Sequence, residues 1–435
     1  MSDARANKDE MIRRLLERYR KLLEEKLPDE PGTLEEIERI TEEIGNETKR
    51  EIEQECVDYH GVGYAGWRLR CSCGGMATFK CHKNKRQQTL SSELVIVRAY
   101  YHCKSCGHGF APLDEALGLD GLCTSIGVRT KIARLASWMP FEEVSAELGH
   151  LCGIHVSRNT AMRIAESMGE RIRQEQAGHQ ELVLSGHAPE ASAQPDRLYI
   201  AIDGVHVPMR GGDWREAKTG VVYETQERGQ TVVVTDREYV ATLAKVDSFA
   251  GKVYAKAFER GVENAKEVVA LGDGAAWIWK SFAHHYPNAV QILDFYHACE
   301  HLNDVARAWY RDQTDQHKRW VEARKTDLLS DSVETVIRSI EAWRPSDPEE
   351  WEIRRTNLAY FKTNKARMLY ATFKTQGYHI GSGLVESACK TVVGQRLKQS
   401  GMRWSETGAE QMLHLRSFLL SRRNADLRTY ARQLS

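Results

Sequence analysis

Residues 197–210, RLYIAIDGVHVPMR, contain the pattern on which the predicted fold depends. The five residues before Asp203 are apolar, a glycine follows it, and apolar residues alternate again at Val205 and Val207. A short apolar run that ends in Asp-Gly is typical of a buried strand, although Asp-Gly alone also favours a hairpin turn. A carboxylate there is costly unless it is paired or bound to a metal ion. Asp203 is therefore either a turn residue or a ligand.

Two further acidic residues favour the ligand. A second apolar strand, in VVALGDGAAWIW, ends in the same way at Asp273, and Glu386 lies in GSGLVESACK. Three carboxylates from separated segments are the set that a two-metal phosphoryl-transfer site needs. Because hard carboxylate oxygens suit Mg²⁺ or Mn²⁺, we expect Asp203, Asp273 and Glu386 to hold two such ions.

The order of the remaining elements predicts an α/β fold. AKTGVVYETQ and REYVATLAKV indicate two more strands, so three antiparallel strands follow one another. The elements expected after them are a helix at 247–259, a strand at 267–271, a helix at 275–285, the strand AVQIL before Asp294, and a helix from Phe295 to about Tyr310. This is the order of a ribonuclease-H-like core with a mixed five-stranded sheet. Its first and fourth strands are neighbours, which would bring Asp203 and Asp273 together.

Helical patterns fill about residues 311 to 375 and indicate an all-helical insertion that interrupts this core before Glu386. The predicted domains are a helical hairpin at 1–60, a zinc-ribbon-like module at 61–112, a helical helix-turn-helix-like domain at 113–176, a linker at 177–196, the first part of the core at 197–310, the insertion at 311–380, and the C-terminal part of the core at 381–435.

The helical hairpin is predicted from two segments. Residues 8–27 carry apolar residues at helical spacing, and Thr33 with Glu36 makes a capping box for a second, acidic helix. The hairpin either mediates self-association or packs on the domain that follows, and its sequence does not decide between these roles.

Four cysteines indicate a structural zinc site. They are Cys71 and Cys73 in LRCSCGG and Cys103 and Cys106 in YHCKSCGHGF, with a strand-like segment between the pairs. Two cysteine pairs, each followed by glycine, are typical of a zinc ribbon in which four thiolates surround Zn²⁺. The first pair is one residue shorter than usual, which leaves its ligands open. The alternatives are Cys81, His82, His102 and His108, or free cysteines buried on two hairpins without metal.

Residues 113–176 are predicted to contain a helix-turn-helix. Pro140 opens one helix, Gly153 breaks the pattern, and Ser157 caps the next helix. The start of that last helix carries residue types that contact base edges or phosphates in DNA complexes. These DNA-binding candidates are Arg158, Asn159, Thr160 and Arg163. Helical hairpins without DNA contacts share this layout, so simple packing is the alternative.

Charge and composition limit the partners. The 435 residues carry no net charge, but 28–58 hold twelve acids and three bases (−9), and 361–435 hold thirteen bases and four acids (+9). The basic C-terminal segment can neutralise phosphates, although a merely solvated helix surface also fits. There is no apolar run of the ~20 residues that span a bilayer and no signal-peptide core in MSDARANKDEMIRR, so a cytoplasmic protein without membrane contact is expected. The ten cysteines are then reduced metal ligands or core residues.

Several segments resemble bacterial insertion-sequence transposases of the Kra group, within the DDE superfamily. They are YIAIDGVHVPMR, WREAKTGVVYE, LGDGAAWIW, DFYHACEHL, and GSGLVESACK with RLKQSGMRWSETGAE, and the likeness covers nearly the whole chain. The resemblance implies that Asp203, Asp273 and Glu386 are the catalytic residues of a DNA transposase, and all three are present.

The insertion resembles that of Mutator-like and related DDE transposases, whose Asp-x-x-His motif matches Asp294 to His297. The match makes Asp294 a candidate further Mg²⁺ ligand. His297 is expected to orient a DNA phosphate or a catalytic carboxylate, with a structural role as the alternative. His301, one turn later, is either its partner or a packing residue.

Basic residues after Glu386 are expected to hold the DNA backbone. They are Lys390, Arg396, Lys398 and Arg403. Trp404 is a candidate for stacking on a base at a cleaved DNA end, against the alternative that it belongs to the core.

The sequence therefore predicts a DNA transposase that acts at the bacterial nucleoid. The zinc ribbon and helix-turn-helix would bind terminal inverted repeats of double-stranded DNA. The carboxylates, with two Mg²⁺ or Mn²⁺ ions, would hydrolyse a phosphodiester and join the freed 3′ end to target DNA, and a homodimer would hold two ends together. The alternatives are a domesticated DNA-binding regulator and a ribonuclease-H-like nuclease such as a resolvase.

Overall fold

The computed structural model describes residues 2–30, 32–119, 121–228, 231–311, 313–381, 383–422 and 424–434. The chain divides into two compact units: unit 1 is Met1–Ala165 with Asp426–Ser435, and unit 2 is Glu166–Ala425. Across the described residues, no helix combines the length and apolar character that crossing a membrane requires.

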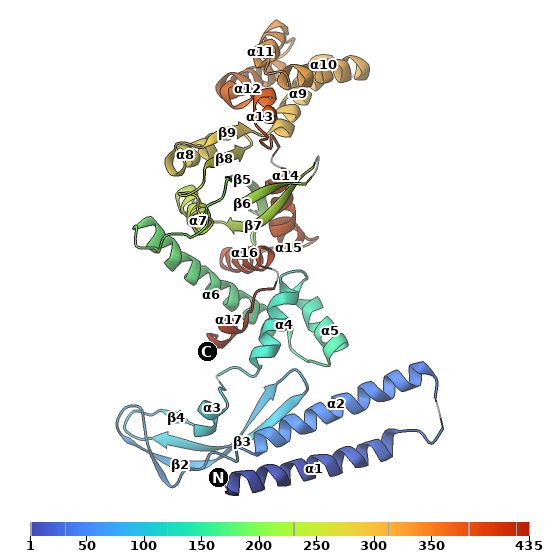
Figure 1. The fold of residues 1–435 in the computed structure, drawn as a ribbon, viewed down its shortest axis with the longest axis vertical. Coiled ribbons are helices and arrows are strands. Elements are labelled where there is room, and N and C mark those ends of the chain that lie inside the picture. The colour runs from blue at the N-terminus through green and yellow to red at the C-terminus, as the bar shows by residue number, and fades with distance from the viewer. Residues whose placement is uncertain are drawn as a thin grey trace. The chain divides into compact units, whose positions relative to one another are not determined.

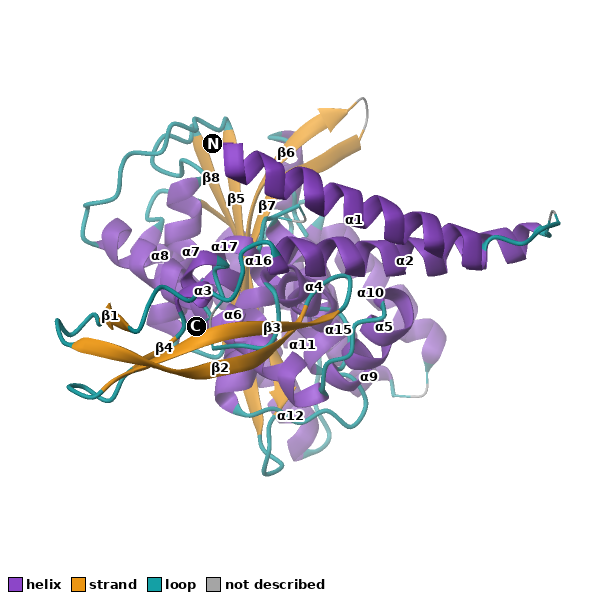
Figure 2. Cartoon of the chain, turned by 90° about the horizontal axis from the view of Figure 1, so that it is seen from below, coloured by secondary structure: helices purple, strands orange, loops and turns teal. Residues whose placement is uncertain are grey.

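Unit 1 begins with a hairpin of α1 (Ser2–Lys26) and α2 (Leu34–Asp58), which lie side by side in Figure 2. Thr33 and Glu36 form the predicted capping box at the start of α2. The buried Glu55 of α2 accepts ion pairs from two arginines of α1, at 3.2 and 3.1 Å. A carboxylate that is buried between two helices and paired from the other helix fixes how they pack.

The cysteine module is a four-stranded antiparallel sheet in the order β1-β2-β3-β4. Its elements are β1 (Arg68–Arg70), β2 (Met76–Gln88), β3 (Glu93–Cys103) and β4 (Gly109–Phe110), followed by the short helix α3 (Pro112–Ala116). One buried cluster of this sheet has five residues, Cys71, Ala77, Ala99, Tyr101 and Cys103. So small a core is rarely sufficient for a stable domain without a metal or disulfides.

The predicted helical domain follows. Its elements are α4 (Ile126–Ala136), α5 (Phe141–Cys152) and the start of α6 (Arg158–Leu184), and α17 (Arg428–Arg432) packs on α4. Gly153 ends α5 with a φ of 60°, a left-handed cap that glycine adopts without strain. Ser157 accepts a hydrogen bond from the backbone N–H of Thr160 at 3.1 Å and so caps α6 as predicted.

The predicted linker at 177–196 is partly wrong, because α6 continues to Leu184. Its later turns are rich in Gln, Glu, Ala and Leu, which are good helix formers, although they show no clear apolar period. The division between the two units also falls inside α6, between Ala165 and Glu166.

Unit 2 is built on a mixed five-stranded sheet in the order β7-β6-β5-β8-β9 (Figure 1). The strands are β5 (Arg197–Pro208), β6 (Trp214–Arg228), β7 (Thr231–Thr242), β8 (Glu267–Gly272) and β9 (Val290–Leu293). β5, β6 and β7 form an antiparallel meander, and β8 and β9 run parallel to β5. The predicted mixed α/β architecture with five strands is confirmed.

Helices cover both faces of this sheet. They include α7 (Val246–Glu259), α8 (Ala276–His285) and α9 (Phe295–Tyr310). A Cβ on Gly220 of β6 would lie 2.7 Å from Val253 of α7, so that face of β6 packs against α7. The adjacent residue, Thr219, points to the opposite face and pairs in register with Asp203. Asp203 therefore lies on the face away from α7.

Helices are present where the insertion was predicted, between β9 and residue 380. Those that follow α9 are α10 (Thr314–Leu328), α11 (Val333–Ala342), α12 (Pro348–Asn364), η1 (Lys365–Arg367) and α13 (Tyr370–Thr375). Figure 1 shows α10, α11 and α12 grouped beside α9. The ring of Trp309 in α9 lies 5.9 Å from both Trp320 and Trp343, so an aromatic core joins the insertion to α9.

The chain then returns to the sheet through α14 (Gly383–Ala388), the π-helix η2 (Cys389–Gly394), α15 (Gln395–Leu397) and α16 (Glu406–Ser421). α14 contacts β5 and β6, η2 contacts β5, and α16 contacts β7. Glu386 thus lies near the start of a helix, as predicted, and this helix packs on the strand that carries Asp203.

Candidate functional site

Asp203 on β5 and Asp273, directly after β8, lie at matching positions along two neighbouring parallel strands. In the register of β5 and β8, Ala201 is opposite Leu271, and each aspartate follows two residues later. Burial raises the pKa of Asp203, and the negative charge of Asp273 raises it further. Both carboxylates are half-buried. The two strands thus place two acidic groups close enough for the charge of Asp273 to act on Asp203.

Asp203 is not a turn residue. β5 runs through it to Pro208 and stays paired with β6, with Gly204 opposite Lys218. A Cβ on Gly204 would lie 2.4 Å from an oxygen of Glu216, so any larger residue would displace that carboxylate. Lys218 is buried and pairs with Glu216 at 3.0 Å. It precedes Thr219, the residue of β6 that lies opposite Asp203.

A buried thiol contacts Asp203. The Sγ–H of Cys389, at the start of η2, donates to Oδ2 of Asp203 at 3.4 Å. Burial raises the pKa of Cys389, and the charges of Asp203 and Glu386 raise it further. Sequence reasoning missed this residue. Its signal was the ESACK segment, in which it follows Glu386 by three residues, about one helical turn.

Glu386 itself points toward solvent. Its carboxylate accepts an ion pair from Lys390, one turn later, at 2.6 Å, and its side chain is exposed. Among the described residues, the one group of three or more His, Cys, Asp or Glu side chains whose ligand atoms lie within 4.8 Å of one another consists of four cysteines. Asp203, Asp273 and Glu386 are therefore not drawn together that closely.

Asp294 and His297 lie next to this pair. The backbone N–H of Asp294 donates to the carbonyl of Gly272 in β8, at 2.9 Å. One carboxylate oxygen of Asp294 accepts from the backbone N–H of His297 at 2.6 Å and caps α9. The residue is only 3% exposed, so its first role is that of a buried cap. His297 is close enough that its charge lowers the pKa of Asp203.

The insertion reaches the site through Tyr360 of α12. Its hydroxyl donates to the backbone carbonyl of Asp273 at 2.9 Å, and its ring stacks on His301 at 3.7 Å. His301 also bonds Asn357 at 2.7 Å, and its ring lies 5.2 Å from that of His297, so it both packs against α12 and neighbours His297. Gly274 has a φ of +107°, and a Cβ there would lie 2.5 Å from the Tyr360 ring. Tyr360 therefore fixes the loop that carries Asp273.

The donor set fits a divalent cation. Asp203 and Asp273 are half-buried, and the negative charge of Asp273 adds to the burial that raises the pKa of Asp203. Carboxylate oxygens are hard donors of the kind that Mg²⁺ and Mn²⁺ prefer. Asp203 and Asp273 would hold such an ion. Glu386 would join them after exchanging its ion pair with Lys390.

The four cysteines of unit 1 converge as predicted. Cys71 lies 3.7 Å from Cys106, and Cys73 lies 3.7 Å from Cys103, measured between sulfurs. Thiolates about 2.3 Å from a tetrahedral Zn²⁺ are separated by about 3.8 Å. Backbone N–H groups donate hydrogen bonds to two of the sulfurs. The N–H of Cys73 lowers the pKa of Cys71, and the N–H of Cys106 lowers the pKa of Cys103. The short first pair thus supplies two members of a group that could hold a metal.

A family model matches residues 77–429, which is most of the chain. The chain belongs to the UPF0236 family. That family is described as uncharacterised, so it assigns no activity. A relative from Streptococcus gallolyticus, named "UPF0236 protein in vanSb 3'region", is 24% identical over 340 residues, which cover 74% of this chain and 69% of the relative. The matched segment of this UPF0236 protein includes both aspartates, Glu386, Cys103 and Cys106.

Two of the DNA-contact candidates in the UPF0236 chain are wrong as direct contacts in this structure. Arg396 is fully buried, and its guanidinium lies 4.8 Å over the ring of Trp404. Trp404 is 6% exposed and donates its indole N–H to the carbonyl of Leu397 at 3.1 Å. The charge count and the motif could not show that these side chains face the core. Trp404 belongs to the core, which was the alternative to stacking on a DNA base.

The remaining candidates for DNA contact at the start of α6 and after Glu386 are accessible, except that Thr160 is half-buried. In unit 2 the side chains of Lys390, Lys398 and Arg403 are exposed. In unit 1, Arg158, Asn159 and Arg163 are exposed at the start of α6, and Thr160 is half-buried beside its cap. Arg158 also pairs with Glu142 at 3.7 Å, and Lys390 with Glu386 at 2.6 Å.

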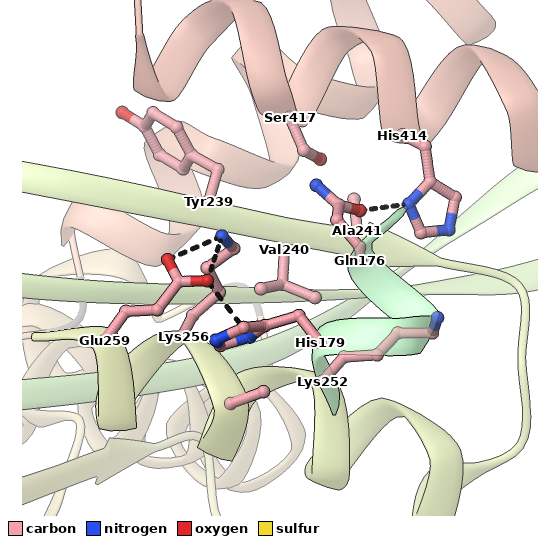
Figure 3. Close-up of a pocket in the computed structure, with 11 residues that line it drawn as sticks. Gln176, His179, Tyr239, Val240, Ala241, Lys252, Lys256, Glu259, His414 and Ser417 are labelled. Atoms are coloured by element: carbon pink, nitrogen blue, oxygen red, sulfur yellow. Dashed lines mark hydrogen bonds and ion pairs between the residues drawn. The ribbon is translucent and has the colours of Figure 1, made fainter. Parts of the chain in front are cut away.

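A small polar pocket lies between α6, α7, α16 and the five-stranded sheet. Figure 3 shows Gln176 of α6 bonded to His414 of α16, and Glu259 of α7 joined to Lys256 and His179. The Gln176–His414 distance is 2.6 Å. This pocket does not include the aspartates, and we interpret it as a structural junction.

The stability of the fold is expected to depend on pH through Glu410, which pairs with His414 at 3.1 Å. Burial opposes its charge, but bonds from His414, from Thr242 and from the N–H of Leu243 bring the pKa of Glu410 from 4.5 down to about 2. A lowered carboxyl pKa stabilises the fold above pH 4.5, and this contribution is lost as the pH falls toward 2.

Glu410→Gln is therefore expected to reduce the free energy of unfolding by about 3 kcal/mol at neutral pH, and by progressively less in acid. Urea melts of both proteins across the acid range measure this. Glu406→Gln, on the exposed turn of the same helix, is the control and should change little. A constant difference at all pH values would contradict the prediction.

Proposed function

We propose that this protein is a DNA transposase of an insertion sequence, which cleaves DNA and transfers strands at a metal-dependent Asp-Asp-Glu site. The single observation that carries the proposal is the position of Asp203 and Asp273, two residues beyond the last paired residues of the parallel strands β5 and β8. The helix of Glu386 packs on the same strand, and its Cys389 contacts Asp203.

The strand order supports a ribonuclease-H-like assignment for the core. In the order β7-β6-β5-β8-β9, a three-stranded meander is followed by two parallel strands, and the first and fourth strands of the chain are neighbours. The helical insertion between β9 and α14 fits the resemblance to the DDE transposases. Fold alone does not give function, so the argument rests on the carboxylates.

Each residue of the site has a defined task in this proposal. Asp203, Asp273 and Glu386 would hold the cations, with Asp294 a further candidate. When bound, two divalent cations supply an activated water or 3′-hydroxyl and stabilise the leaving oxygen. His297 would orient a DNA phosphate or Asp203. The carboxylates are ligands and not nucleophiles, so no covalent bond to the chain forms.

The other modules would bring double-stranded DNA to this site. The exposed start of α6 and the Zn²⁺-bound ribbon would bind the terminal inverted repeats. Exposed Lys390, Lys398 and Arg403 would neutralise phosphates near the cut. Two DNA ends must be handled together, which favours a homodimer acting at the bacterial nucleoid.

The test uses the purified full chain and a linear DNA that carries both ends of the genomic segment encoding it. With Mg²⁺ or Mn²⁺, we expect breaks at those ends and joining of the freed 3′ ends to a second DNA, and EDTA should prevent both. Binding of the ends without any cleavage in either metal would favour the regulator. Preferential cleavage of four-way junctions would favour the resolvase.

A further inference from the structure

The hairpin of α1 and α2 leaves an apolar face uncovered within unit 1. A groove of about 550 Å³ runs between the two helices. One wall is an apolar stripe of α1 in which Leu16 is 63% exposed and Tyr19 is 41% exposed. Several exposed apolar side chains on one face are typical of an interaction surface.

The stripe has the spacing of a coiled-coil seam. Ile12, Leu16, Tyr19 and Leu23 are separated by steps of four, three and four residues. The hairpin's own contact uses a different side of α1, on which Leu22 is buried. α1 therefore carries two apolar stripes, and only one of them is used inside the hairpin.

The α2 side of the groove, its floor, contains small residues, Thr41, Gly45 and Thr48, beside Ile44, Glu51 and Ile52. A Cβ on Gly45 would meet nothing within 4 Å, so the space above it is open. The hydroxyl oxygen of Thr48 is buried and has no hydrogen-bond partner among the described residues. A protruding stripe and a shallow floor on the same face are self-complementary, which is the condition for a two-fold symmetric interface.

Charge favours the same pairing. α1 has eight bases and six acids (+2), whereas α2 has three bases and ten acids (−7). In a two-fold pair, α1 of one copy enters the groove beside α2 of the other, so a basic helix meets an acidic one. We infer that the face formed by α1 and α2 is the interface with a second copy of this chain.

The expectation of two copies rests on the proposed function, but the choice of surface rests on the hairpin alone. Sedimentation of the full chain, without DNA or added metal, therefore tests the surface independently of catalysis. We expect the wild-type chain to sediment as a dimer at micromolar concentrations. A dimer that never cuts DNA would leave this inference standing, and an active protein that sediments as a single chain would overturn it alone.

Two variants test the groove. Leu16→Gln with Tyr19→Gln removes the exposed stripe, and Gly45→Leu fills the floor. Each is expected to weaken dimerisation by at least about 100-fold, because apolar contacts are lost or blocked in both copies. Leucine is a better helix former than glycine, so loss of the dimer in Gly45→Leu is not a result of unfolding.

The matched control changes the far side of α1. Glu17→Gln with Lys21→Gln removes one ion pair of 3.4 Å on exposed side chains and leaves the net charge unchanged. This variant should dimerise like the wild type. Circular dichroism confirms that all variants keep their helices. If the groove variants dimerise as tightly as the control, the interface lies elsewhere and the inference is wrong.

Discussion

Asp203→Asn is expected to reduce DNA cleavage and strand transfer by more than about 10³-fold, the scale on which loss of one member of a catalytic unit is felt. Asparagine keeps the shape of the side chain but removes the charge that holds a divalent cation. Because burial and the neighbouring Asp273 both disfavour a negative charge at this position, removing it should not lower the melting temperature. Loss of activity with an unchanged or raised melting temperature is the result expected of a ligand.

The control for this variant is Asp196→Asn, just before the other end of β5. Asp196 is exposed and pairs with Lys266 at 2.5 Å, so the same change of charge occurs far from Asp273. Its cleavage rate should match the wild type, and both variants should still bind the DNA ends. Full strand transfer by Asp203→Asn would exclude Asp203 as a metal ligand and overturn the proposed mechanism.

The pair of aspartates was predictable because its signal is local. Each aspartate ends a run of apolar residues, and runs of this kind form the buried strands β5 and β8. The parallel register then follows from the order of the elements. The capping box of Thr33 and Glu36 was predictable for the same reason, since it depends on a spacing of three residues.

Contacts between distant segments were not predictable. Tyr360 bonds the backbone of Asp273 across 87 residues, and no local pattern marks a tyrosine in an amphipathic helix as part of a site. The contact of Cys389 with Asp203 depends on how the π-helix η2 packs on β5, and π-turns have no simple sequence signature. The burial of Arg396 also depends on packing, since a basic residue in a basic segment is expected at the surface.

Cys103→Ser is expected to abolish zinc binding and to unfold the sheet of β1 to β4. The buried cluster around Tyr101 has only five residues, so we expect a bound metal to supply much of the stability of this sheet. Structural zinc sites contribute about 10–16 kcal/mol of apparent binding free energy, which is free energy of folding when the site does not exist in the unfolded chain. Hydrogen exchange of β2 and β3 should therefore rise to that of an unfolded segment.

Cys81→Ser is the control for Cys103→Ser, because it removes a cysteine of the same module that is outside the four-cysteine cluster. Cys81 lies on β2, is exposed, and is not one of the four clustered cysteines. Metal analysis should find one zinc ion per chain in the wild type and in Cys81→Ser, and none in Cys103→Ser or Cys73→Ser. Loss of zinc from Cys81→Ser but not from Cys73→Ser would mean that the ligand set predicted from the two cysteine pairs is wrong. The two sulfur–sulfur distances of 3.7 Å favour the first outcome, because they match the edges of a tetrahedron around zinc.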